Sequence, residues 1–371
     1  MKIDAFKVEE WFNNYGQNAK YDLADTCIES MSINELLELA NIKNIDDILS
    51  QKLDYGQIQG SDRLKNAIKS LYKKQEQENI TITHGAIGAN QLVFLSLIEP
   101  KDEVISILPA YQQHYSIPKS LGANVKHLFL KPENNWLPDT KELKKLVTPK
   151  TKLISLINPN NPTGSVITDE LMEEIIDVAN GAYIISDEVY RDIVNDNRYK
   201  TTSIVDLYNK GIATSSLSKG FSLAGLRVGW IVANKKIISE INHQREYNTI
   251  SVSQIDDYFA SIALENKDKI FERNLQKREL GLEILKSWLN FEPNISCIIP
   301  NGGTTAFLRY KMNISSFELC KKLLNDTGIL FLPGETLEMN GYLRIGYCNN
   351  HKKMKEALEI FSDWIKDTPS F

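Results

Sequence analysis

Short apolar runs alternate with helical segments between about residues 80 and 235, and this alternation constrains the fold more than any other feature of the chain. The apolar runs are Ile80–Ile82, Glu103–Leu108, Val125–Leu130, Leu153–Ile157, Tyr183–Ser186, Ile212–Thr214 and Trp230–Val232. Helical patterns such as Leu171–Ala179 separate most of them. Strands that alternate with helices favour a mostly parallel sheet sandwiched by helices. In such an α/β fold the ligand binds at the carboxyl ends of the strands.

The two ends of the chain have a different pattern. Residues 1–50 begin with an amphipathic segment, and a charged, helix-rich stretch runs from residue 236 to about residue 290. The tail then mixes predicted strands with predicted helices, namely Thr304–Tyr310 and Tyr342–Tyr347 with Ser316–Leu324 and Lys353–Ile365. We therefore expect a large α/β domain over residues 51–275 and a smaller α+β domain formed from both termini, residues 1–50 and 276–371.

Composition and charge exclude several classes of protein. Of the 371 residues 42% are hydrophobic and 25% charged, which is ordinary for a globular protein, and the net charge of −5 disfavours nucleic-acid binding. No apolar run approaches the roughly 20 residues of a membrane span, and the N-terminus lacks an apolar signal segment. The four cysteines and five histidines are scattered without metal-type spacing. We expect no metal, nucleic-acid or membrane partner and a cytoplasmic location.

A lysine follows the predicted strand Ile212–Thr214, in the sequence Ser216-Leu217-Ser218-Lys219-Gly220-Phe221, and Arg227 lies shortly beyond it. Burial there disfavours the ammonium form, lowers the pKa of Lys219 and makes the free amine available as a nucleophile. Ser216 and Arg227 could together hold a phosphate dianion. An amine nucleophile beside a phosphate clamp indicates pyridoxal 5'-phosphate (PLP). The alternative is a solvated lysine on a loop.

Two further strand ends carry polar side chains. Asp187 ends the run Tyr183–Ser186, where a carboxylate can bond a pyridinium nitrogen, and Tyr190 could donate to a phenolate oxygen on the same ring. In the alternative, Asp187 caps the next segment and Tyr190 belongs to the core. Asn161 lies in the Pro- and Asn-rich loop after Leu153–Ile157, and Pro162 pushes its backbone toward an extended conformation. Its amide could thus point at a ligand, although an ordinary turn has the same composition.

Small residues after the first predicted strand suggest a phosphate-binding turn. Gly85, Ala86 and Ile87 open a predicted helix, whose N-terminus offers free N–H donors, and no Walker A pattern follows. Tyr111 follows the strand Glu103–Leu108 and is placed to stack on an aromatic ring.

Tyr55 and Arg344 lie outside this central region. Tyr55, in Tyr55-Gly56-Gln57-Ile58-Gln59-Gly60, could deliver a phenol to a phosphate or could belong to a surface turn. Arg344 lies in the middle of the predicted strand Tyr342–Tyr347, where its charge needs a partner. A substrate carboxylate is one such partner, and an internal salt bridge is the alternative.

Taken together, these segments resemble the class I/II aminotransferases of PLP fold type I, which are aspartate aminotransferase-like. The resemblance covers nearly the whole chain. It rests on the order of seven motifs: Tyr55 to Gly60, Gly85-Ala86, Tyr111, Asn161 to Gly164, Asp187 with Tyr190, Ser216 to Arg227, and Arg344.

The resemblance implies a role for each matching residue. Lys219 would form the Schiff base with PLP, and Asp187 would bond the ring nitrogen. Tyr190 and Asn161 would bond the ring oxygen, with Asn161 also near the substrate carboxylate. The phosphate would be held by Ser216, Arg227 and the amides of Gly85, Ala86 and Ile87, and Tyr111 would stack on the ring. Tyr55 would reach the phosphate in a neighbouring subunit. Arg344 would bind the substrate α-carboxylate. A homodimer with shared active sites follows from the role of Tyr55.

The chain departs from the family pattern in two segments. The segment Leu23-Ala24-Asp25-Thr26-Cys27 stands where family members often have a glycine that touches substrate, and His84-Gly85-Ala86-Ile87 lacks the usual serine or threonine. Asp25, Glu29 and His84 near the pocket would favour a cationic substrate side chain.

We expect an aminotransferase that moves an amino group between an amino acid and a 2-oxoacid. A PLP-dependent lyase or cyclase on the same fold, acting by elimination or in the manner of capreomycidine synthase, is the alternative, because fold does not determine reaction. A transcriptional regulator with an aminotransferase-like domain would need a DNA-binding module, and residues 1–50 are too short and not basic.

Overall fold

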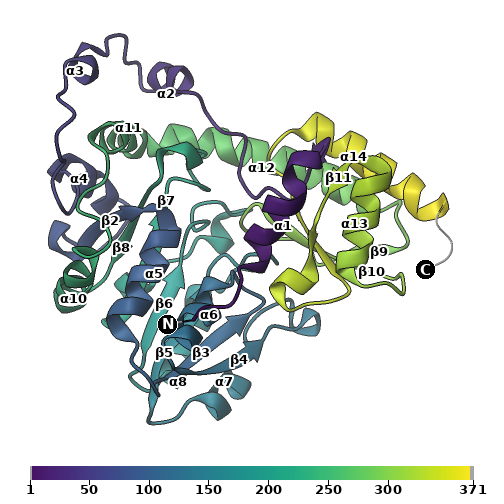
Figure 1. Ribbon diagram of the computed structural model, residues 1–371, viewed down its shortest axis with the longest axis horizontal. Coiled ribbons are helices and arrows are strands. Elements are labelled where there is room, and N and C mark those ends of the chain that lie inside the picture. Colours follow the sequence, from purple (N-terminus) through teal and green to yellow (C-terminus); the bar gives the residue numbers. More distant parts are fainter. Residues whose placement is uncertain (1, 368–371) are drawn as a thin grey trace.

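A seven-stranded sheet forms the centre of the larger part of the molecule (Figure 1). The computed structural model describes residues 2–367. The strand order is β2-β8-β7-β6-β5-β3-β4. The strands are β2 (Ile80–His84), β3 (Glu103–Leu108), β4 (Asn124–Phe129), β5 (Thr151–Ile157), β6 (Tyr183–Asp187), β7 (Gly211–Ser216) and β8 (Val228–Val232). Only β8 runs antiparallel to its neighbours β2 and β7, so the sheet is mostly parallel as the sequence predicts.

Helices cover both faces of this sheet because successive strand residues point to opposite sides. In β6, Ile185 packs in one buried cluster with α5 and α10, and Ile184 packs in the other with α4, α8 and α11. The helices of this part are α4 (Asp62–Lys69), α5 (Gly85–Leu97), α6 (Gln113–Ser120), α7 (Thr140–Leu146), α8 (Asp169–Val178), α9 (Ile204–Leu207), α10 (Lys235–Arg245) and α11 (Gln254–Glu265). The predicted α/β sandwich is therefore confirmed.

A second, four-stranded antiparallel sheet has the order β12-β13-β10-β9. Its strands are β9 (Ile295–Cys297), β10 (Thr305–Tyr310), β12 (Leu332–Pro333) and β13 (Tyr342–Gly346), and the helices beside it are α13 (Ser316–Thr327) and α14 (His351–Asp367). Local sequence sets the ends of α13: the Ser315 side chain accepts a hydrogen bond from the backbone of Glu318, and Gly328 adopts a left-handed φ of 77°. The long helix α12 (Lys267–Leu289) connects the two parts (Figure 1).

The N-terminal residues form α1 (Lys7–Tyr15), β1 (Tyr21–Asp22), α2 (Ile33–Leu39) and α3 (Asp46–Leu49). Of these elements, β1 lies against the second part, whereas α2 and α3 lie on the side of α4 and α11 (Figure 1). Strand β1 pairs in parallel with β11 (Ile329–Leu330), and the backbone N–H of Gly346 donates to the Leu23 carbonyl at 2.7 Å. A Cβ at Gly346 would lie 1.7 Å from the Asp25 carbonyl oxygen, so only glycine fits there. The division into residues 1–50 and 276–371 on one side and 51–275 on the other stays a prediction.

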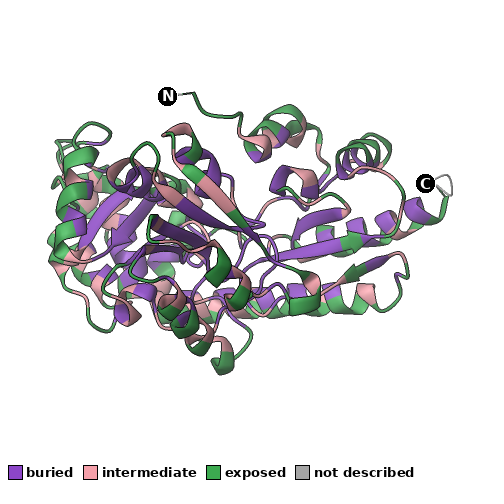
Figure 2. Cartoon of the chain, turned by 90° about the horizontal axis from the view of Figure 1, so that it is seen from below, coloured by how far each residue is buried: buried purple, intermediate pink, exposed green. Residues whose placement is uncertain are grey.

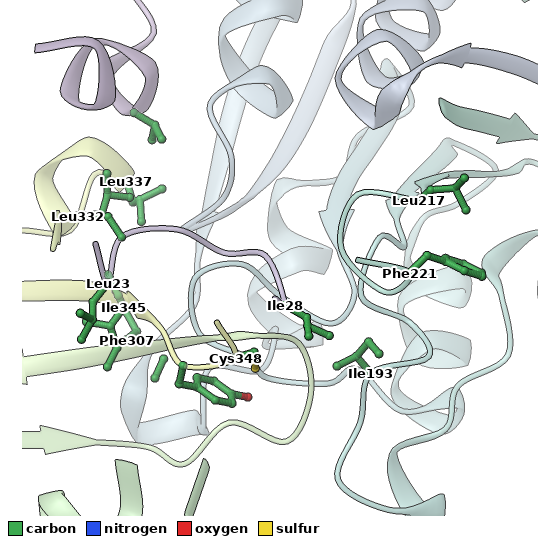
Figure 3. Close-up of a cluster of buried hydrophobic side chains, with 14 of the residues drawn as sticks. Leu23, Ile28, Ile193, Leu217, Phe221, Phe307, Leu332, Leu337, Ile345 and Cys348 are labelled. Atoms are coloured by element: carbon green, nitrogen blue, oxygen red, sulfur yellow. The ribbon is translucent and has the colours of Figure 1, made fainter. Parts of the chain in front are cut away.

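The strands of both sheets are largely buried, and the outer faces of the helices are exposed (Figure 2). One buried hydrophobic cluster joins the two parts of the molecule. It contains Leu217 and Phe221, which flank Lys219 in the chain, together with Leu23, Ile28 and Ile345 (Figure 3). The lysine-bearing loop and the N-terminal segment are thus held by one core. Among residues 2–367, no helix has the length and apolar character needed to cross a membrane.

Candidate active site

A cavity of about 370 Å³ lies at the carboxyl ends of β5, β6 and β7. This is the edge at which ligands bind to parallel sheets. Ten of the residues predicted from the sequence line it: Ala86, Ile87, Tyr111, Asn161, Asp187, Tyr190, Ser216, Lys219, Arg227 and Arg344. Two predicted residues do not. Gly85 contacts the cavity wall, because a Cβ there would lie 3.0 Å from Nη2 of Arg227, and Tyr55 is 79% exposed on the outer surface.

The amine of Lys219 donates hydrogen bonds to the N-terminal segment. Its Nζ donates to Oγ1 of Thr26 at 2.6 Å and to Sγ of Cys27 at 3.3 Å. Burial lowers the pKa of Lys219, but the facing Tyr190, Cys27 and Asp25 raise it, and the net pKa lies above the usual range of lysine. Burial acts in the expected direction, but the expectation that the pKa of Lys219 is lowered overall is wrong. The groups that favour the ammonium form come from segments far away in the sequence.

Two layers of side chains hold Asp187. The amide of Asn90 donates to its Oδ2 at 2.9 Å, the backbone N–H of Val189 donates to its Oδ1 at 3.2 Å, and Nε2 of His114 lies 3.6 Å from Oδ2. Behind them, Thr214 donates to Asn90 at 2.7 Å, and Nδ1 of His114 shares a hydrogen bond of 2.6 Å with Ser155. Two of the three Asp187 contacts come from outside its own loop, so more than local capping accounts for its position.

The start of α5 and Arg227 provide hydrogen-bond donors for an anion in the cavity. Helix α5 begins at Gly85 with a left-handed φ of 67°, and within residues 2–367 the side chain of the preceding His84 makes no capping hydrogen bond. The first-turn N–H groups of this helix can therefore serve a ligand. Arg227, with a left-handed φ of 54°, lies beside Gly85 and donates to the carbonyl of Ala224 at 2.8 Å. Ser216 and Ser218 also line the cavity.

Arg344 is 2% exposed and projects from β13. Its Nη2 donates to the carbonyl of Ala24 at 2.9 Å, and its Nη1 donates to Oδ1 of Asn161 at 3.3 Å. Burial lowers the pKa of Arg344. Its Nε has no hydrogen-bond partner, and no carboxylate of residues 2–367 forms an ion pair with it. The internal salt bridge offered as the alternative is thus not found among residues 2–367; Asp25 and Glu9 act on Arg344 only from beyond ion-pair distance, and a buried cation without an ion pair suits an anionic ligand.

Four polar residues that line the cavity have no assigned role in the sequence analysis. They are Glu9, Asn90, Gln113 and Ser218. Only Ser218 had a local signal, since it precedes Lys219; Glu9 comes from α1, and the hydroxyl of Tyr111 donates to it at 2.7 Å. Of the departures from the family pattern, Asp25 and Thr26 line the cavity, whereas Glu29 pairs with Lys277 and His84 does not line it. Among residues 2–367 no group of His, Cys, Asp and Glu side chains could hold a metal ion.

Comparisons with known proteins agree with this arrangement. A crystal structure of a PLP-dependent aminotransferase from Streptococcus suis is 40% identical and covers all of both chains with a TM-score of 0.96. Capreomycidine synthase of Streptomyces vinaceus is 28% identical over 97% of this chain and 94% of its own. Aspartate aminotransferase of Pyrococcus horikoshii is 31% identical over 85% of both chains. Residues 31–361 match the family described as aminotransferase class I and II. The chain therefore belongs to the class I and II aminotransferases, a family of PLP-dependent enzymes.

Proposed function

We propose that this enzyme transfers an amino group between an amino acid and a 2-oxoacid. The observation that carries the proposal is the position of Lys219, whose amine is buried in a cavity that also contains Asp187, Arg227 and the unpaired Arg344. An amine nucleophile, an anion site for a cofactor and a second anion site for a substrate carboxylate are the elements that such a transfer needs.

The residues of the cavity fit PLP. The start of α5, Arg227 and Ser216 would hold its phosphate, and Asp187 would accept a hydrogen bond from the protonated ring nitrogen and keep it protonated. Among residues 2–367, Nε2 of His114 has no hydrogen-bond partner and lies 3.6 Å from Oδ2 of Asp187, so it is available to Asp187. Tyr111 would stack on the ring, and Tyr190 and Asn161 would reach its oxygen. When bound, PLP supplies an electron sink that makes the Cα–H bond of an amino acid acidic.

The residues of the chain would then orient the substrate and move its proton. Arg344 would bind the α-carboxylate by its two-pronged guanidinium and thereby place the Cα–H bond toward Lys219. The amine of Lys219 would take the proton from Cα and return it to the cofactor carbon that receives the amino group. Thr26 and Cys27, at 2.6 and 3.3 Å in this structure, offer contacts for the amine.

A half-reaction tests this function. The amino acid alone should convert bound PLP into pyridoxamine phosphate, and a 2-oxoacid should restore PLP, both followed by absorbance and product analysis. The similarity to capreomycidine synthase over 97% of the chain favours a lyase or cyclase as the second candidate. That alternative holds if the substrate turns over many times without any oxoacid and pyridoxamine phosphate never forms.

Arg344→Ala should raise the KM for the amino acid at least about tenfold, because a charged hydrogen bond to the carboxylate contributes roughly 1.5–3 kcal/mol. Arg344→Lys should restore little of this loss, because lysine lacks the planar fork. Steady-state kinetics check the prediction, and Arg309→Ala, an exposed arginine on the neighbouring strand β10, is the control. An unchanged KM in Arg344→Ala would assign the arginine to the fold instead.

We also propose that the working unit is a homodimer in which Tyr55 reaches the cavity of the partner. Tyr55 lies in one of two segments that carry exposed apolar side chains and contact each other through Gln254 and the Asp54 carbonyl at 2.8 Å. These side chains are Leu49, Leu53, Tyr55, Ile58, Tyr247, Ile250 and Ile255. Exposed apolar side chains on neighbouring segments are typical of protein–protein contacts, and a second copy of the chain covers them in the proposal.

Subunit mixing tests the shared site. Tyr55→Ala and Lys219→Ala homodimers should each have little activity, whereas a mixed dimer contains one cavity with both residues intact. Mixing should therefore restore activity at up to one of the two sites. Absence of recovery in samples shown by native mass spectrometry to contain mixed dimers would contradict a shared site.

A further inference from the structure

Two carboxylates that line the cavity have no part in the proposed transfer. Six charged side chains line it, three acidic and three basic: Glu9, Asp25, Asp187, Lys219, Arg227 and Arg344. The proposed function uses the last four, for the ring nitrogen, the proton transfer, the phosphate and the α-carboxylate. Two carboxylates, Glu9 and Asp25, are left over, and neither forms an ion pair with another side chain of residues 2–367.

Asp25 lies between two groups of the proposed mechanism. The preceding residue, Ala24, accepts from Arg344, and the following residue, Thr26, accepts from Lys219. The half-buried carboxylate of Asp25 accepts from the backbone of Cys27 and from the Asn349 amide, both at 3.0 Å. These neutral donors hold the carboxylate in place without an ion pair among residues 2–367, and its charge acts on Lys219 and Arg344 only across the cavity.

Glu9 brings a second carboxylate from α1. Its Oε1 accepts from the hydroxyl of Tyr111 at 2.7 Å, a ring that also lines the cavity. The nearest cation on the same helix, Lys7, is paired with Glu338 at 2.7 Å. Glu9 is therefore held at the cavity by a neutral contact, and its charge acts on Arg344 across the cavity without forming an ion pair among residues 2–367.

Gln113 is an independent indication that the ligand of this cavity donates hydrogen bonds. Its amide nitrogen donates to the carbonyl of Ile87 at 3.0 Å, and its Oε1 is buried without a hydrogen-bond partner among residues 2–367. The residue is only 7% exposed and lines the same cavity. A buried acceptor without a donor is costly, so a ligand that donates hydrogen bonds would compensate for it.

We propose that the substrate amino acid has a cationic side chain, a guanidinium or an ammonium, which Glu9 and Asp25 bind while Arg344 binds its α-carboxylate. The inference rests on the proposed function, because it takes Arg344 and Lys219 to be committed to the reacting end of the substrate. Opposite charges attract strongly in a partly buried site, and an acidic side chain would meet two like charges there. A guanidinium also carries enough N–H donors to serve an acceptor such as Gln113 at the same time.

Unreactive carboxylates of matched length separate this binding from turnover. We suggest calorimetry on the PLP-loaded protein with 5-guanidinopentanoate, 6-aminohexanoate and hexanoate, which lack an α-amino group. The cationic ligands should bind at least about tenfold more tightly than hexanoate, as expected for charge-assisted hydrogen bonds. Asp25→Asn and Glu9→Gln keep the shape and a hydrogen-bonding oxygen. Each should reduce that preference severalfold and leave hexanoate binding unchanged.

The control is Glu10→Gln, which removes the same charge from the same helix at an exposed position that does not line the cavity. It should leave the preference unchanged. Equal binding of all three ligands, or an equal effect of Glu10→Gln and the cavity variants, would overturn the inference. If a neutral amino acid still supports the half-reaction in that case, the proposed function survives. If no amino acid supports it, the proposed function fails and the inference fails with it.

Discussion

Lys219→Ala should lose transfer activity by at least about a thousandfold, because it removes both the nucleophile and the group that moves the proton. The protein should still fold, since Leu217 and Phe221 on either side keep the loop in the core. Borohydride reduction of the unaltered protein should fix the cofactor on the peptide that contains Lys219, identified by mass spectrometry.

An exposed lysine is the control for this experiment. Lys236→Ala, on α10 and away from the cavity, should keep full activity and the same labelled peptide. Cofactor fixed to another lysine, or near-normal turnover in Lys219→Ala, would contradict the role given to Lys219.

Asp187→Asn should retain PLP but lower kcat by roughly a hundredfold to a thousandfold, the effect of removing one preorganised electrostatic contact in an active site. The asparagine has nearly the same volume and can still accept from Asn90, so the change is mainly one of charge. Without the carboxylate, the ring nitrogen would lose the partner that keeps it protonated, and the electron sink would weaken. Cofactor content and kcat, measured on the same sample, check the prediction. Near-normal turnover would refute it.

The matched control is Asp177→Asn on the exposed face of α8, which should leave kcat unchanged. Asp187→Ala goes further, because it leaves the Asn90 amide without its acceptor in a buried place. It should therefore also lower the thermal midpoint, which Asp187→Asn should change little. Comparing the two variants separates the charge of Asp187 from its packing.

Much of the fold follows from local sequence. Apolar β-branched runs separated by amphipathic helices predict the parallel sheet, and the polar residues at the strand ends, such as Asp187 and Lys219, are the ones that line the cavity. Site residues at strand ends can be predicted from sequence because a parallel sheet brings the carboxyl ends of its strands to one edge. Motif order then adds Arg344, which periodicity alone would assign to a core strand.

The remaining features depend on contacts between distant segments. Glu9 and Tyr111 meet across 102 positions of the chain, and Lys219 and Thr26 across 193. No local pattern encodes such distances, so the raised pKa of Lys219 and the presence of Glu9 in the cavity were not predictable from composition. The support of Asp187 by Asn90, across 97 positions, is of the same kind.

The way the N-terminal segment is inserted between later strands has a consequence for synthesis of the protein. Ala24 accepts its hydrogen bond from Arg344, 320 positions further on, and β1 pairs with β11. At roughly 5–20 residues per second, a ribosome needs about 15–60 s to make the intervening chain. The residues around Ala24 therefore lack these hydrogen-bond partners until after all seven strands of the large sheet have been synthesised. The wall that carries Asp25 and Thr26 can only close over the cavity once Arg344 has been synthesised.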